Sequence, residues 1–133
     1  FGYQAVVDAD DNVEELEWRL LGAPTRLTLR EVGERIHELG GLFIAAHLDR
    51  AVFSVTSQLG GLSGDEGFDA VELSRHATLE AWRDKTLGLP VIRSSDARYL
   101  GDIGTIWREA DLSVCSTQAL KAALNRLPRP ATL

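Results

Sequence analysis

The first segment that could position functional side chains is residues 42–46 (LFIAA), an apolar run that is followed directly by His47 and then by Arg50. Neutral imidazole is a common zinc ligand in proteins. An arginine side chain binds phosphate through its planar guanidinium group. The alternatives are that His47 forms a hydrogen bond within a loop, and that Arg50 pairs with Asp49 or another acid. The pattern therefore makes His47 a candidate metal ligand and Arg50 a candidate phosphate contact.

A second apolar run, residues 90–95 (PVIRSS), is followed by Asp96. A carboxylate in this position can bind a divalent cation or orient a metal-bound water. The alternative is that Asp96 caps the following turn, since Ser-Asp pairs often accept hydrogen bonds from nearby backbone amides. Asp96 is therefore a second candidate metal ligand.

Both runs are too short for a typical helix and are better interpreted as strands. Open α/β sheets and α/β barrels carry their catalytic and ligand-binding residues at the carboxyl ends of strands. We therefore expect His47 and Asp96 to lie close together. Glu72 lies inside a third strand-like segment, residues 68–73 (FDAVEL). A buried acid there needs a partner, whereas an edge position would leave Glu72 exposed.

The remaining pattern alternates between strands and helices. Thr28 and Glu31 have the spacing of a capping box, and apolar residues then recur at helical intervals. We predict strands at residues 1–8, 42–46, 68–73 and 90–95, an extended segment at 105–108, and helices at 13–21, 29–39, 51–59, 76–87 and 117–125. This alternation indicates an α/β fold with mainly parallel strands.

Composition limits the possible functions. The chain has 133 residues, enough for one domain spanning residues 1–133, and its formal charge of −6 makes nucleic-acid binding an unfavourable interpretation. Its apolar runs are too short to span a membrane, and its one cysteine cannot form an internal disulfide, so we expect a cytoplasmic protein. The start at Phe1 and the absence of methionine favour a segment of a longer polypeptide.

Three phrases together resemble the PHP (polymerase and histidinol phosphatase) superfamily, and specifically the C-terminal half of a PHP-type phosphoesterase. The phrases are GGLFIAAHLDR (residues 40–50), FDAVEL (68–73) and VIRSSDARYLGDIG (91–104). Their order, their placement at strand ends and the gap of roughly fifty residues between His47 and Asp96 fit the family.

The resemblance implies a fold, an activity and a site. The fold would be the C-terminal part of a distorted (βα)7 barrel, whose C-terminal face holds divalent metal ions such as zinc, manganese or iron. These ions activate water for the hydrolysis of phosphate esters. Carried over onto this sequence, His47 matches a metal-ligating histidine, and Asp96 matches the ligating aspartate of the terminal Ser-Asp-x-His motif.

The chain departs from the family pattern at two points. Arg98 stands where the family has histidine, and arginine has no lone pair for a metal ion. The family's opening His-x-His motif occurs nowhere in this chain. At most two ligands remain, fewer than a firmly held zinc ion requires. We expect the isolated chain to be inactive, and we assign no catalytic residue.

Three hypotheses follow, and the third is a purely structural module of a larger nucleic-acid-processing enzyme. The first is the C-terminal portion of a metal-dependent phosphoesterase, which acts on a small phosphorylated substrate when the remainder of its own polypeptide completes the site. Arg50 and Arg98 would then contact the substrate phosphate. The alternative is a degenerate, non-catalytic PHP-like domain that binds a phosphorylated ligand or a protein partner. An incomplete barrel would leave an open sheet edge, so a homodimer is also expected.

Overall fold

The computed structural model describes residues 2–128 and contains two separate sheets. The larger sheet has three parallel strands in the order β3 (Ile44–Ala45), β4 (Ala70–Leu73) and β5 (Val91–Arg93). The prediction of an α/β fold with parallel strands is confirmed for this sheet. Within the described residues the sheet is open, and it does not close into a barrel.

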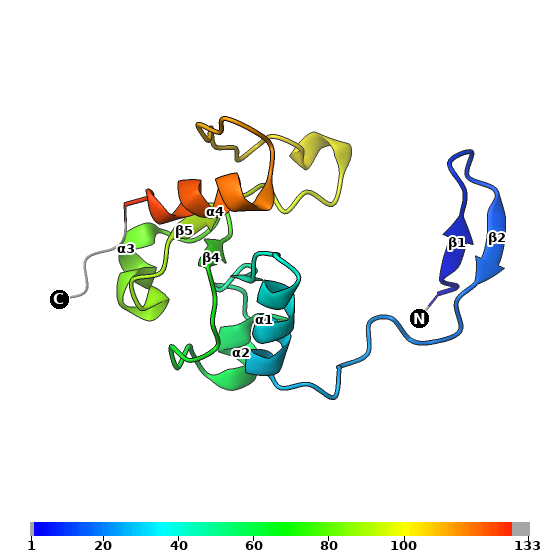
Figure 1. Ribbon diagram of the computed structural model, residues 1–133, viewed down its shortest axis with the longest axis horizontal. Coiled ribbons are helices and arrows are strands. Elements are labelled where there is room, and N and C mark those ends of the chain that lie inside the picture. Colours follow the sequence, from blue (N-terminus) through cyan, green and yellow to red (C-terminus); the bar gives the residue numbers. More distant parts are fainter. Residues whose placement is uncertain (1, 129–133) are drawn as a thin grey trace.

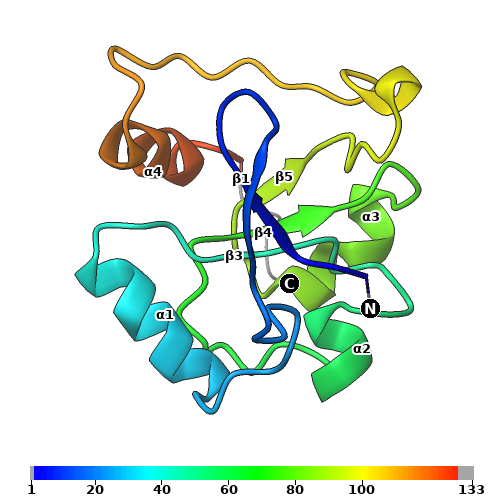
Figure 2. The same cartoon turned by 90° about the vertical axis from the view of Figure 1, so that its right-hand side faces the viewer.

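The helices cover both sides of this sheet, as Figure 2 shows. One side carries α1 (Leu29–Glu38) and α4 (Thr117–Asn125), and the other carries α2 (Val55–Leu59) and α3 (Leu79–Trp82). Two short 3-10 helices, Arg83–Thr86 and Leu100–Asp102, complete the regular structure. Three of the four residues of β4, Ala70, Val71 and Leu73, are apolar and buried, as expected for a strand that is covered on both faces, and the fourth is Glu72.

The core lies between the central strands and the helices. Leu29, Val32 and Ile36 recur at helical spacing and place one face of α1 against it. The rings of Phe43 and Phe68 stack with their centroids 4.4 Å apart. The fully buried or nearly buried apolar members are Phe43, Ala45, Leu48, Phe68, Val71, Leu73 and Val91.

The start of α1 follows the sequence prediction closely. The Thr28 hydroxyl accepts a hydrogen bond from the Glu31 amide, and the Glu31 carboxylate accepts one from the Thr28 amide at 2.7 Å. Similar N-terminal caps come from Ser54 at α2, Thr78 at α3 and Ser116 at α4. Each cap satisfies an amide that has no partner inside the helix.

The predicted helix at residues 13–21 is wrong. Residues 13–16 form β2 (Val13–Leu16), which pairs antiparallel with β1 (Ala5–Val7) in a hairpin that stands apart from the larger sheet (Figure 1), and residues 17–21 lie outside the helices and strands. The reason lies in the turn, where the Asp8 carboxylate accepts hydrogen bonds from the amides of Asp10 and Asn12. This turn closes the chain back on itself and outweighs the uneven apolar stripe of residues 13–21.

Other predicted elements are present but shorter. Residues 51–54 stay outside α2, and residues 76–87 divide into α3 and the 3-10 helix that follows it. Residues 105–108, predicted to be extended rather than helical, lie outside the helices and strands. Throughout residues 2–128, no helix has the length and apolar character that a membrane crossing requires.

Candidate functional site

The carboxyl ends of the three parallel strands meet at one edge of the sheet. His47 to Arg50 follow β3, Ser74 to His76 follow β4, and Ser94 to Arg98 follow β5. Since neighbouring parallel strands run in the same direction, these three segments lie at one edge of the sheet.

Glu72, on the central strand, connects the segments that follow the two outer strands. Its Oε2 atom accepts a hydrogen bond from the His47 amide at 3.1 Å, and its Oε1 atom accepts one from the Ser94 hydroxyl. Glu72 is therefore neither an exposed edge residue nor an unpaired buried acid. Its carboxylate fixes the backbone at His47 relative to the segment that leads to Asp96.

The backbone at both candidate metal ligands is unusual. His47 has φ 31° and Asp96 has φ 44°, in the left-handed region that residues with a side chain rarely adopt. The Nδ1 atom of His47 is buried and has no hydrogen-bond partner among residues 2–128. Such outliers are frequent at functional sites, where the surrounding structure holds them in place.

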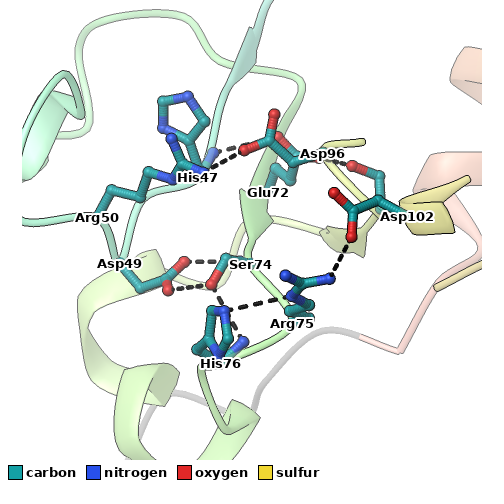
Figure 3. A network of polar contacts seen from close by, with 10 residues as sticks. His47, Asp49, Arg50, Glu72, Ser74, Arg75, His76, Asp96 and Asp102 are labelled. Atoms are coloured by element: carbon teal, nitrogen blue, oxygen red, sulfur yellow. Dashed lines mark hydrogen bonds and ion pairs between the residues drawn. The ribbon is translucent and has the colours of Figure 1, made fainter. Parts of the chain in front are cut away.

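Asp96 is paired with Arg50. The Asp96 Oδ2 atom lies 2.6 Å from Arg50 Nη2, although the groups are not aligned as a hydrogen bond (Figure 3). Both side chains are about one-third exposed (33% for Arg50 and 31% for Asp96), so solvent weakens the attraction. The candidate metal ligand and the candidate phosphate contact therefore bind each other in this structure.

A pocket of about 170 Å³ opens at this edge of the sheet, and it contains three of the four predicted site residues: Arg50, Asp96 and Arg98. His47 does not line the pocket, but its bond to Glu72 holds it at the same edge. We call this space the strand-end pocket; its lining residues are Arg50, Ser74, Arg75, His76, Ser95, Asp96, Arg98, Tyr99 and Asp102.

The charges in the strand-end pocket favour an anion. Its three arginines outnumber its two aspartates, in a chain whose formal charge is −6. Arg50 pairs with Asp96, and Arg75 lies 3.2 Å from Asp102. Arg98 is exposed and has no ion-pair partner within the described part of the chain. Its guanidinium is therefore available to an incoming anion.

The segment after β4 forms one wall of the pocket and is tightly held. Asp49 accepts hydrogen bonds from the amide and the hydroxyl of Ser74, both at 2.6 Å. Burial alone would raise the pKa of Asp49, but these bonds outweigh it and keep the pKa below its ordinary value. Figure 3 shows the contacts continuing from Ser74 to His76, and from Arg75 to Asp102.

Sequence reasoning missed six lining residues: Ser74, Arg75, His76, Ser95, Tyr99 and Asp102. A signal for two of them was present, because Arg75 and His76 follow a strand in the same way as His47 and Asp96 do. Tyr99 and Asp102 lie in an irregular loop and around a 3-10 helix, where no periodic pattern identifies them.

The described residues do not form a complete metal site by themselves. Within residues 2–128, no group of three or more His, Cys, Asp or Glu side chains is arranged to hold an ion. His47 contributes a buried ring nitrogen without a partner, and Asp96 contributes a carboxylate that Arg50 already neutralises.

Comparisons with known proteins give no match: no family model, no curated protein and no solved structure is significantly similar to this chain. The function must therefore be inferred from the strand-end pocket and from the residues around it.

Proposed function

We propose that this chain is the C-terminal portion of a PHP-type metal-dependent phosphoesterase, and that its own role is to bind the phosphate group of a small phosphorylated substrate. The observation that carries this proposal is the meeting of Arg50, Asp96 and Arg98 in one pocket at the carboxyl edge of a parallel sheet. This edge is the usual place for ligands in folds of this class.

Arg98 is the primary phosphate contact in this proposal. Its planar guanidinium can donate two parallel hydrogen bonds to phosphate oxygens, and no acid competes for it within the described residues. Arg50 is a second contact. Because Arg50 is paired with Asp96, phosphate must either displace the Asp96 carboxylate or share the Arg50 guanidinium with it. The pocket would therefore bind phosphate through one free arginine and one arginine already held in place.

Hydrolysis would need more than these residues. A divalent ion such as zinc, manganese or iron, when bound, would supply an activated water for attack on the phosphate ester. His47 and Asp96 would contribute ligands, and the remainder of the polypeptide would supply the others. Because the described residues form no complete set of ligands, we assign them no step of the hydrolysis.

Replacing Arg98 by glutamine tests phosphate binding. We expect the affinity for inorganic phosphate, measured by isothermal titration calorimetry, to fall about tenfold or more because a charge-assisted contact is lost. Arg26→Gln is the matched control, since Arg26 is exposed and does not line the strand-end pocket. An equal loss in both variants would mean that only net charge matters, and would contradict the proposal.

The ion pair between Arg50 and Asp96 favours a second candidate function, a non-catalytic PHP-like domain that binds a phosphorylated ligand or a protein partner. With its carboxylate neutralised and Arg98 in place of a histidine, the site would keep phosphate recognition without metal chemistry. This candidate predicts phosphate binding with no hydrolysis, even in the longest polypeptide that contains the chain.

The variant Arg98→His separates the two candidates. In the longer polypeptide we expect it to raise manganese or zinc content, measured by elemental analysis after dialysis, because it restores an imidazole and removes a repelling charge. Arg98→Gln controls for the loss of charge alone. A metal content that stays unchanged with histidine would count against the phosphoesterase and favour the binding domain.

A further inference from the structure

Arg93 is the last residue of β5, and its side chain reaches the segment that follows the neighbouring strand β4. Its Nη2 atom lies 3.1 Å from the carbonyl oxygen of Ser74, 3.0 Å from that of Arg75 and 3.1 Å from that of Ala77. These carbonyls belong to one turn, in which the Ala77 amide also donates to the Ser74 carbonyl. The Arg93 guanidinium therefore binds three of the four carbonyl groups of residues 74–77.

The turn held by Arg93 forms one wall of the strand-end pocket. Ser74, Arg75 and His76 all line that pocket, whereas Arg93 does not. Arg93 instead lines adjacent hollows beside Arg108. The side-chain contacts of Arg93 therefore connect it to the strand-end pocket through residues 74–77.

The turn is fixed from both neighbouring strands. Asp49, beyond the end of β3, binds the amide and the hydroxyl of Ser74, while Arg93 binds carbonyls of the same turn from β5. These contacts hold the backbone that carries Arg75 and His76. Arg75 Nε then lies 3.3 Å from His76 Nε2, so the two side chains are placed together.

A further feature of Arg93 is its Nε atom, which is buried and has no hydrogen-bond partner among residues 2–128. A buried donor without a partner is unfavourable, and such a group calls for an explanation. The bonds from Nη2 to the turn provide one, because they require the guanidinium to lie beneath the turn rather than in solvent.

We propose that Arg93 is a positioning residue of the strand-end pocket: by holding the carbonyls of residues 74–77, its guanidinium sets the placement of Arg75 and His76 and thereby the affinity for phosphate. The effect on affinity rests on the proposed function. The effect on the turn does not, because it can be measured without a ligand.

The test uses Arg93→Gln and Arg93→Lys in the full chain, with inorganic phosphate as the probe. We expect Arg93→Gln to weaken phosphate binding about tenfold. In the ligand-free protein it should also shift the ring resonances of His76 in NMR spectra, which a His76→Gln spectrum identifies. Arg93→Lys keeps the charge and three N–H donors on a shorter side chain, so both changes should be smaller.

Arg108→Gln is the matched control. Arg108 donates to the Val91 carbonyl at 3.4 Å and does not line the strand-end pocket, so phosphate affinity and the His76 resonances should stay unchanged. A folded Arg93→Gln protein with unaltered His76 resonances would overturn the proposal. If this variant fails to fold, Arg93→Lys decides, because unshifted His76 resonances there overturn it too. A wild-type chain that does not bind phosphate overturns the proposed function, while the His76 resonances still decide the role of Arg93.

Discussion

Replacing Asp69 by asparagine will destabilise the fold by about 2 kcal/mol, because it removes a charge-assisted contact that joins three elements. The Asp69 side chain is only 10% exposed and lies immediately before β4. It accepts hydrogen bonds from the Phe43 amide at 2.8 Å, from Lys121 of α4 at 2.7 Å and from His37 of α1 at 2.8 Å. Asparagine retains one acceptor oxygen but loses the charge, so it cannot replace all three contacts.

The same contacts make the stabilisation depend on pH. Burial alone would raise the pKa of Asp69, but the hydrogen bonds from Lys121, the Phe43 amide and His37 outweigh it, so the folded-state pKa lies below the ordinary value. The contribution is therefore fully present above the unfolded-state pKa, about 4, and is lost as the pH falls through the lower folded-state value.

Urea unfolding at pH 7 and at pH 3 would measure both effects. The difference between the wild-type chain and Asp69→Asn should be about 2 kcal/mol at pH 7 and should shrink at the acidic end. Asp84→Asn is the control, because Asp84 is exposed. A difference that is the same at both pH values would show that the charge of Asp69 does not contribute.

Replacing Leu48 by alanine will destabilise the fold by about 3 kcal/mol, the largest effect that we expect from a single substitution. Leu48 is 0% exposed and belongs to the central core, directly between His47 and Asp49. Its amide also donates to the Glu72 carbonyl at 2.8 Å, which extends the pairing of β3 and β4. Removing the side chain would leave a cavity that these surroundings cannot readily close.

The midpoint of urea or thermal unfolding measures this loss. Leu39→Ala is the matched control, because the Leu39 side chain is 89% exposed and its truncation should change the unfolding free energy by less than about 0.5 kcal/mol. Comparable losses at the two positions would mean that Leu48 is not packed as the structure describes.

The sequence predicted best where local chemistry decides the structure. The capping box of Thr28 and Glu31, followed by Leu29, Val32 and Ile36, placed helix α1 within a residue of its observed bounds. The apolar runs likewise identified the three parallel strands, but they gave lengths that were too great. Only a few residues in each run have a neighbouring strand with which to pair.

The hairpin was missed because its determinants are not periodic. Asp8 closes the turn through its carboxylate, and the Gln4 side chain donates to the carbonyls of Glu17 and Arg19. These contacts join residues across the turn, where a pattern of apolar spacing carries no information. A search for Asp and Asn clusters between β-branched residues would have favoured a hairpin.

The strand-end pocket was predictable in part. Placement at strand ends indicated Arg50, Asp96 and Arg98, and the structure brings these three residues together. Placement at strand ends could not reveal that Asp96 pairs with Arg50, because each side chain has several possible partners in the sequence. The three carbonyl contacts of Arg93 depend on which strand lies beside β5, and the sequence alone does not give that strand order.

At His47 and Asp96, a left-handed backbone carries the two side chains that the proposed function uses as metal ligands. Glycine adopts such angles without steric cost, so glycine at either position would relieve this strain, although it would also make the unfolded chain more flexible. That exchange would discard the imidazole or the carboxylate. At these two positions, relief of the backbone strain and retention of the proposed metal ligands are therefore incompatible.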